Sequence, residues 1–213
     1  MKFSHILFLI AIIFITASWF YQPKLRERKR SFTISKSQKR YVIKKITEEK
    51  WRLKAADAKN FIRQKNYDNN YCFLIDMSLP SANKRFVIYD LKKDSIIDKG
   101  LVAHGNCFEY WLEGRRYSNV VGSGCTSLGK YKIGNPYTGK FGYSYKLHGL
   151  DSTNNNAFER TVVLHAHSCI PEKESSDEIC QSNGCPTVSL NFLVLLKKII
   201  SHSNKPFLLW IYE

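Results

Sequence analysis

From residue 72 onward, the chain is a series of short runs of β-branched and aromatic residues separated by turn residues, and this pattern restricts its fold more than any other feature. Runs of this kind occupy residues 73–77, 85–91, 95–104, 143–147, 161–165 and 207–212. Residues 90–94 are typical of a hairpin turn, and glycines recur from residue 122 to residue 142, as in a sheet with tight bends. We therefore expect a mostly β fold.

Two segments have the spacing of a helix instead. Four apolar residues share one face of the first helix: Trp51, Ala55, Ala58 and Ile62. Thr47 is the expected N-cap of this helix, and residues 21–45 before it are expected to form a tether. Residues 21–70 together are therefore predicted to be a basic linker and an amphipathic helix. A second helix is expected to begin at Ser189, so that one helix precedes the strands and the other lies near their end.

The N-terminal segment is almost wholly apolar. Residues 6–20 have the character of a signal peptide or a short membrane anchor, and we assign residues 1–20 to such a segment. Lysines and arginines at residues 24–30 follow closely, and charge bias alone would keep this flank in the cytoplasm. Six cysteines in 213 residues suit an oxidising compartment better. We therefore predict export to the periplasm or cell envelope, with residues 1–20 either removed or kept as an anchor.

The chain is strongly basic, with a formal net charge of +15. Such an excess suits nucleic acid, an anionic membrane or an anionic polymer as a partner. Much of the charge falls in residues 24–65, ahead of the β-rich region, and aromatic residues do not alternate with it as stacking platforms for bases would. We therefore predict no nucleic-acid partner.

The densest group of reactive side chains lies at residues 162–188. A β-branched run there places His165 at a strand end, and Cys185 follows Gly184 in a turn shortly before the last helix. A thiol attacks an acyl carbon only as the thiolate, which requires a nearby base or a positive dipole. The pattern predicts Cys185 as a nucleophile, His165 as its base, and Gly184 as the residue that lets backbone N–H groups face an oxyanion.

The cysteine lies in the series Ser182-x-Gly184-Cys185-Pro186, with the histidine upstream at a strand end. Further motifs precede it in order: His104-Gly105, residues 126–131, His148-Gly149-Leu150 and residues 156–165. With this order and spacing, the chain resembles the catalytic domain of the murein L,D-transpeptidases, in the subgroup with proline after the cysteine. The resemblance covers roughly residues 72–212, so we assign residues 71–213 to the catalytic domain.

The resemblance implies an L,D-transpeptidase-like β-sandwich with flanking N-terminal and C-terminal helices. It also implies peptidoglycan stem peptides as substrates, and neither a cofactor nor a metal. The Cys185 thiolate would attack the carbonyl at the L-centre of the third stem residue and expel D-alanine. A second stem's amine, or water, would resolve the thioester, so L,D-carboxypeptidase trimming at the same site stays open.

Several residues are expected to support this chemistry. Ser182, His148 and Gly149 are carried over with Gly184 as oxyanion or support residues, although a histidine followed by glycine is about as often a structural hydrogen-bond donor. The wider family commonly has arginine two residues after the cysteine, where this chain has Thr187. Arg160, which the subgroup shares, is our candidate to replace that arginine as a substrate-binding residue.

Two other readings of the site stay open. On a strand, His165, His167 and Cys169 would point to one face, and with Cys180 and Cys185 they offer enough ligands for zinc. The spacings between these cysteines are not those of the usual short zinc knuckles. A non-catalytic wall-associated domain of the same fold is the remaining alternative.

The cysteines that flank an acidic loop are expected to form a disulfide. Cys169 and Cys180 enclose ten residues that are too polar to become ordered by burial, and a bond between them would steady the link between base and nucleophile. Cys107 and Cys125 are a second candidate pair, which would leave Cys72 buried on its strand. The competing outcome is a bond between Cys180 and Cys185 that would lock the nucleophile.

Overall fold

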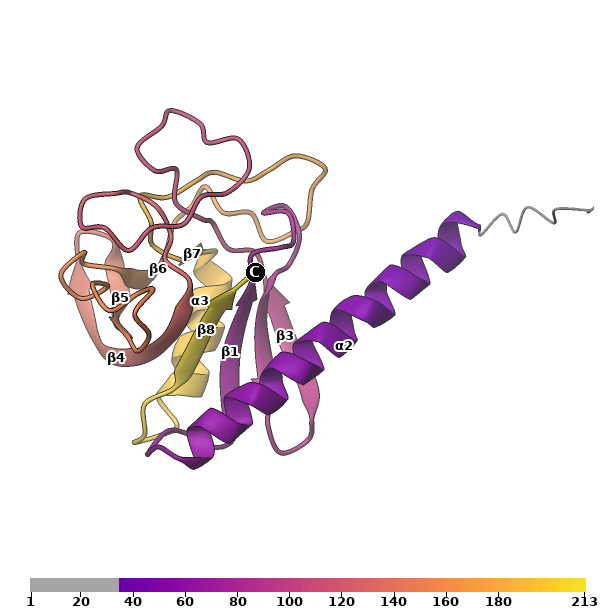
Figure 1. Cartoon of the computed structure of the whole chain (residues 1–213), viewed down its shortest axis with the longest axis horizontal. Helices are drawn as coiled ribbons and strands as arrows, with labels where there is room; N and C mark the ends of the chain where they lie inside the picture. The colour runs from indigo at the N-terminus through magenta and orange to yellow at the C-terminus, as the bar shows by residue number, and fades with distance from the viewer. Residues whose placement is uncertain (1–34) are drawn as a thin grey trace, which may run out of the picture. The chain divides into compact units, whose positions relative to one another are not determined.

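The computed structural model describes residues 35–213 (Figure 1), so the leader or anchor predicted at residues 1–20 lies outside the described residues. The chain divides into two units after Val42, and the second unit, residues 43–213, contains all of the strands described below. No helix in residues 35–213 is both long enough and apolar enough to cross a membrane.

The strands of the described residues form one eight-stranded sheet with the order β3-β2-β1-β8-β4-β5-β6-β7. The strands are β1 (Tyr71–Asp76), β2 (Phe86–Asp90), β3 (Ser95–Gly100), β4 (Gly129–Gly139), β5 (Gly142–Gly149), β6 (Val163–Ala166), β7 (Thr187–Val188) and β8 (Leu208–Tyr212). β1 pairs in parallel with β8, and β6 with β7, while the other neighbours are antiparallel. In the chain, α2 (Lys36–Arg63) precedes all of the strands and α3 (Leu190–Ile200) lies between β7 and β8. The expected mostly β fold, with one helix before the strands and one near their end, is therefore confirmed.

The sheet is buried on both faces around β1. Phe73 and Ile75 belong to one hydrophobic core, which also contains Phe192 and Leu196 of α3. Cys72 and Leu74, which point to the opposite face of β1, belong to a second core that the buried face of α2 completes. Because both faces are covered, β1 is a continuous apolar run in the sequence and not an alternating one.

The helix α2 begins earlier than expected, at Lys36, so the expectation that residues 36–45 are part of a tether is wrong. Ser35 and Gln38 form a capping box: the Ser35 hydroxyl accepts from the Gln38 N–H at 3.2 Å, and the Gln38 side chain accepts from the Ser35 N–H at 3.1 Å. Thr47, expected as the N-cap, lies inside the helix and donates its hydroxyl to the Ile43 carbonyl at 2.9 Å. The predicted buried face is confirmed, since the four residues named above are the buried residues of this helix.

Two strands were not expected from the sequence. β4 is interrupted by glycines and by Pro136, and its register against β5 shifts between Ile133 and Pro136. It is nevertheless central, because it pairs with β8 on one side and β5 on the other. β7 has only two residues, which is too short for any pattern. β4 and β5 connect β8 to β6, which carries His165, and β7 lies at the edge of the sheet beyond β6.

Candidate active site

The pairing of β6 with β7 brings the predicted nucleophile and base to one cavity. The two strands are parallel, with His165 opposite Thr187. Cys185 precedes Thr187 by two residues, and its sulfur accepts from the Val163 N–H of β6 at 3.5 Å. Cys185, His165 and Thr187 all line a cavity of about 240 Å³. The long segments at residues 101–128 and 167–186 meet at this end of the sheet (Figure 1), where Gly105 bridges to Ser182.

The turn before Cys185 depends on Gly184 and Ser182. Gly184 has a φ of 104°, in the left-handed region, and a Cβ atom on it would lie 2.7 Å from the Cys125 carbonyl oxygen. The Ser182 hydroxyl donates to the Cys185 carbonyl at 2.6 Å and accepts from the Gly184 N–H at 3.2 Å. The Ser182 side chain thus shapes the turn and occupies the Gly184 N–H in this structure.

The His165 ring is held in one tautomer. Its Nδ1 lies 3.1 Å from the Ala166 carbonyl, which only accepts, so Nδ1 carries the proton. Nε2 then accepts from the Thr187 hydroxyl at 2.9 Å. Phe141, at the tip between β4 and β5, stacks on the ring with centroids 4.4 Å apart. Burial lowers the pKa of His165, against the Ala166 carbonyl, which raises it, so the imidazole is neutral near pH 7.

The Cys185 thiol is half-buried and free. Burial raises its pKa above the ordinary value, and this effect outweighs the Val163 N–H and the positive charge of Arg160, both of which lower the pKa. Among the described residues, no hydrogen bond joins the sulfur to a ring nitrogen of His165. The resting pair is therefore a neutral thiol and a neutral imidazole.

Arg160 lies behind the catalytic turn, with its guanidinium bonded to the segment at residues 118–127. It donates to the Ser118 carbonyl at 2.7 Å, to the hydroxyls of Ser127 at 3.0 Å and Ser123 at 3.3 Å, and to the Cys125 carbonyl. A Cβ atom on Gly184 would lie 3.4 Å from Nη2, so the positive charge is close to the turn that carries the thiol. In this arrangement Arg160 supports the turn from within the protein.

His148 and Gly149 are not among the residues that line this cavity. His148 lines a second cavity of about 430 Å³, and its ring stacks on Phe158 with centroids 5.2 Å apart. Gly149 adjoins the loop that follows β5, where an added Cβ would lie 1.8 Å from the Asn154 carbonyl oxygen. These two residues lie at the end of β5, where Gly149 packs closely against the turn at Asn154.

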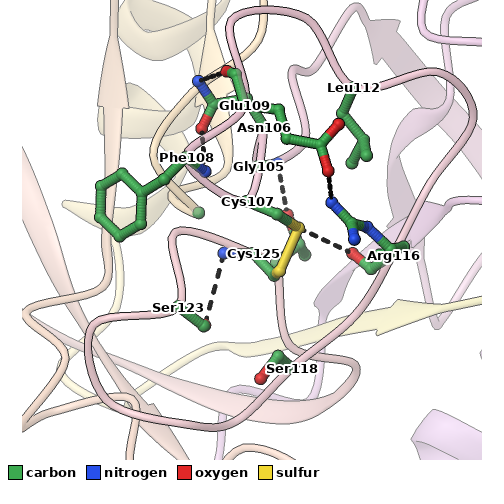
Figure 2. Close-up of a disulfide and its surroundings, with 12 residues drawn as sticks. Gly105, Asn106, Cys107, Phe108, Glu109, Leu112, Arg116, Ser118, Ser123 and Cys125 are labelled. Carbon is green, nitrogen blue, oxygen red and sulfur yellow. Dashed lines mark hydrogen bonds and ion pairs between the residues drawn. A yellow bond between two sulfur atoms is a disulfide. The ribbon is translucent and has the colours of Figure 1, made fainter.

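Four of the six cysteines form two disulfides. Cys169 and Cys180 are bonded, with Cα atoms 6.2 Å apart, and both line the cavity that holds Cys185. Cys107 and Cys125 are also bonded (Figure 2), with Cα atoms 4.2 Å apart, and Cys72 is buried and free. Residues 35–213 contain no group of three or more His, Cys, Asp or Glu side chains placed to hold a metal ion. Two of the five candidate zinc ligands, Cys169 and Cys180, are thus committed to a disulfide.

Three parts of the site were missed in the sequence: Phe141, the hydroxyl of Thr187, and the segment at residues 104–107. This segment is paired with the catalytic turn, because the Ser182 N–H donates to the His104 carbonyl at 2.8 Å and the Asn106 N–H donates to the Ser182 carbonyl at 2.7 Å. All three depend on contacts between residues far apart in the chain. Only the His104-Gly105 motif signalled one of them.

Comparison with solved structures finds an L,D-transpeptidase from Xylanimonas cellulosilytica, with 17% identity and a TM-score of 0.38, covering 67% of this chain and 60% of that one. The helical cell shape determining protein of Campylobacter jejuni has 12% identity and a TM-score of 0.44, covering 76% of this chain and 55% of that one. An L,D-transpeptidase from Mycobacterium smegmatis has 8% identity and a TM-score of 0.40, covering 68% and 59%. This chain thus spans about 60% or less of the length of these proteins.

No curated protein sequence matches the chain. The family model of the L,D-transpeptidase catalytic domain, however, matches residues 38–212, which include most of α2 and the cavity with Cys185. A match over this much of the chain shows the family. The chain therefore belongs to the L,D-transpeptidase catalytic domain family.

Proposed function

We propose that this chain is a cell-wall murein L,D-transpeptidase that forms or exchanges peptide bonds through a thioester on Cys185. The observation that carries the proposal is the shared cavity, in which a free thiol and a neutral imidazole of fixed tautomer lie on neighbouring strands. The family match supports peptidoglycan as the substrate. The two disulfides support an oxidising compartment such as the periplasm or cell envelope.

Acylation begins with the transfer of the thiol proton to Nε2 of His165. The Thr187 hydroxyl occupies that nitrogen at rest, but it has a second acceptor, the Cys185 carbonyl, at 3.3 Å. Turning to that carbonyl frees Nε2 for the proton. The Ala166 carbonyl stabilises the imidazolium that forms, and the positive charge of Arg160 favours the thiolate.

The thiolate then attacks the carbonyl at the L-centre of the third stem residue. The resulting oxyanion collapses to a thioester on Cys185, and D-alanine leaves with the proton held by His165. A second stem's amine attacks the thioester in turn, gives its proton to His165 and releases the cross-linked product. If water takes the place of the amine, the same steps trim the stem, which makes the enzyme an L,D-carboxypeptidase.

Incubation with tetrapeptide muropeptides, followed by mass spectrometry, tests the proposal. Wild type should give a cross-linked product, or a trimmed one if water is the acceptor, and Cys185→Ser should give neither. A penem-type β-lactam should add covalently to the wild type once and not to Cys185→Ser. An adduct on Cys185→Ser, or no reaction of the wild type with muropeptides, would overturn the proposal.

A pair of histidine variants tests the base. His165→Ala should lose about 10² to 10⁴ in the rate of turnover, the range for a general base. His167 is exposed on the rim of the same cavity, and its Nδ1 accepts from the Cys169 N–H at 3.1 Å, so His167→Ala is the matched control. His167→Ala should keep most of the activity. If it is the slower of the two variants, His165 is not the base.

A further inference from the structure

A loop beside the candidate active site exposes three aromatic side chains. Phe108 is 65% exposed, Trp111 is 45% exposed and Tyr110 is fully exposed, all within four residues. Aromatic residues of a folded domain usually contribute their large apolar surface to the core. We call Phe108, Tyr110 and Trp111 the aromatic loop. A cluster of this kind on a protein surface marks an interaction site.

The aromatic loop is held in place by several bonds. Cys107 and Phe108 have φ values of 54° and 61°, in the left-handed region that residues with side chains rarely adopt. The Cys107–Cys125 disulfide and the side chain of Asn106 hold this backbone, with Asn106 accepting from the Phe108 N–H at 3.0 Å and donating to the Glu109 carbonyl at 2.9 Å. Figure 2 shows the Phe108 ring pointing away from the disulfide. Strain kept by this many constraints is typical of functional loops.

The residues on either side of the aromatic loop are bonded to the wall of the cavity that holds Cys185. Leu112 and Gln181 exchange two hydrogen bonds, of 2.9 Å and 2.8 Å, between the Leu112 backbone and the Gln181 side chain. The Asn106 N–H donates to the Ser182 carbonyl. Gln181 and Ser182 both line the cavity. A substrate larger than the 240 Å³ cavity must extend beyond it, and the aromatic loop is part of the surface next to the cavity wall.

We infer that the aromatic loop binds sugar rings of the glycan strand from which the reacting stem peptide extends, an inference that rests on the proposed function. The C–H faces of a pyranose ring are apolar and flat, and they stack on aromatic rings, whereas a stem peptide offers mainly carboxylates, amines and methyl groups. A membrane surface would require free cations next to the aromatic side chains. Arg116 is instead paired with Glu109, and the Nε of Arg115 lies 3.8 Å from a Glu213 carboxylate oxygen.

The test compares the full chain with Tyr110→Ala/Trp111→Ala, both exposed positions where substitution leaves the fold stable. The matched control is Leu190→Ala/Val194→Ala, which removes two exposed apolar side chains from α3. On disaccharide-linked tetrapeptide, the loop variant should show KM raised about tenfold with kcat unchanged, a size typical of two lost aromatic contacts. On the free tetrapeptide, all three proteins should behave alike.

Co-sedimentation with glycan strands stripped of their peptides gives a readout that does not need turnover. The loop variant should bind these strands about tenfold more weakly than the wild type and the control. If the wild type turns over neither peptide but the loop variant still loses strand binding, the proposed function is rejected and the glycan site is kept. Equal strand binding by all three proteins would overturn the inference, as would a loop variant that loses binding only to vesicles of anionic phospholipid.

Discussion

The Cys107–Cys125 disulfide joins residues 18 apart in the chain, across the loop that bears the exposed aromatic residues. In the chain-entropy model, closing a loop of this length restricts the unfolded chain by about 3 kcal/mol. For a domain of this size each kcal/mol shifts Tm by roughly 2–4 °C, so Cys107→Ala/Cys125→Ala should lower Tm by about 6–12 °C. Scanning calorimetry measures this directly, and the alanine pair leaves no new thiol.

The same bond should also affect the nucleophile. The segment at Asn106 pairs with Ser182, and the carbonyl of Cys125 accepts from Arg160, so the disulfide links two supports of the catalytic turn. Loosening them should move Arg160 away from the thiol, and the pKa of Cys185 should rise because Arg160 lowers it. The iodoacetamide alkylation rate of Cys185 should therefore shift to higher pH in the variant.

A second double variant separates this effect from lost stability alone. Cys169→Ala/Cys180→Ala opens a loop of 11 residues, for which the same model also gives about 3 kcal/mol, but neither cysteine is bonded to Arg160. Its alkylation profile should keep the wild-type midpoint. The reasoning is refuted if the Cys107→Ala/Cys125→Ala variant has an unchanged Tm, or if the two variants shift the alkylation midpoint equally.

Two further predictions concern stability. Burial and the neighbouring Arg85 lower the pKa of His104 to about 4, against about 6.5 when it is unfolded, so only the unfolded chain binds this proton between pH 6.5 and 4. The free energy of unfolding should fall by up to about 3 kcal/mol as the pH falls through this window. In His104→Asn, the free energy of unfolding measured by urea titration should depend less on pH between 6.5 and 4. An unchanged slope would contradict the assignment. Gly149→Ala places a Cβ 1.8 Å from the Asn154 carbonyl oxygen and should cost about 3 kcal/mol or prevent folding. Its control, Gly142→Ala, meets no atom and should cost only about 1–2 kcal/mol for its φ of 70°; equal losses in thermal unfolding would show that the contact at Asn154 relaxes.

The parts of the fold that could be predicted are those with strong local patterns. β1, β2 and β8 are apolar runs, and Ser189 caps α3 as expected, its hydroxyl accepting from the Phe192 N–H at 3.3 Å. The start of α2 was missed because Ser35 and Gln38 cap it within a polar, basic segment that has no apolar face of its own. β4 was missed because its glycines and Pro136 are turn signals, which its long pairing with β5 and β8 overrides.

The candidate site also has parts that local motifs predict and parts that depend on strand pairing. Cys185 and His165 lie in short motifs whose chemistry can be read along the chain. The stack of Phe141 on His165 depends on the register of β5 against β6, and the bond from Thr187 to the ring depends on the register of β6 against β7. Arg160 was found in the sequence, but its bonds to residues 118–127 require the fold. Register is a property of paired strands, so no single segment contains it.

The position of β8 has a consequence for the order of folding. This strand, the last one described, lies between β1 and β4 and separates the half of the sheet nearest β3 from the half that carries β6 and β7. Until residues 208–212 are inserted, β1 and β4 each present an unpaired edge, and the backbone contacts between the two halves are those of the segment after β3 with β7, such as the bond from the Ala103 N–H to the Thr187 carbonyl at 2.9 Å. A chain shortened before Leu208 would therefore hold the complete Cys185 motif and yet lack the strand that joins it to the rest of the sheet. Such a chain should aggregate through those edges.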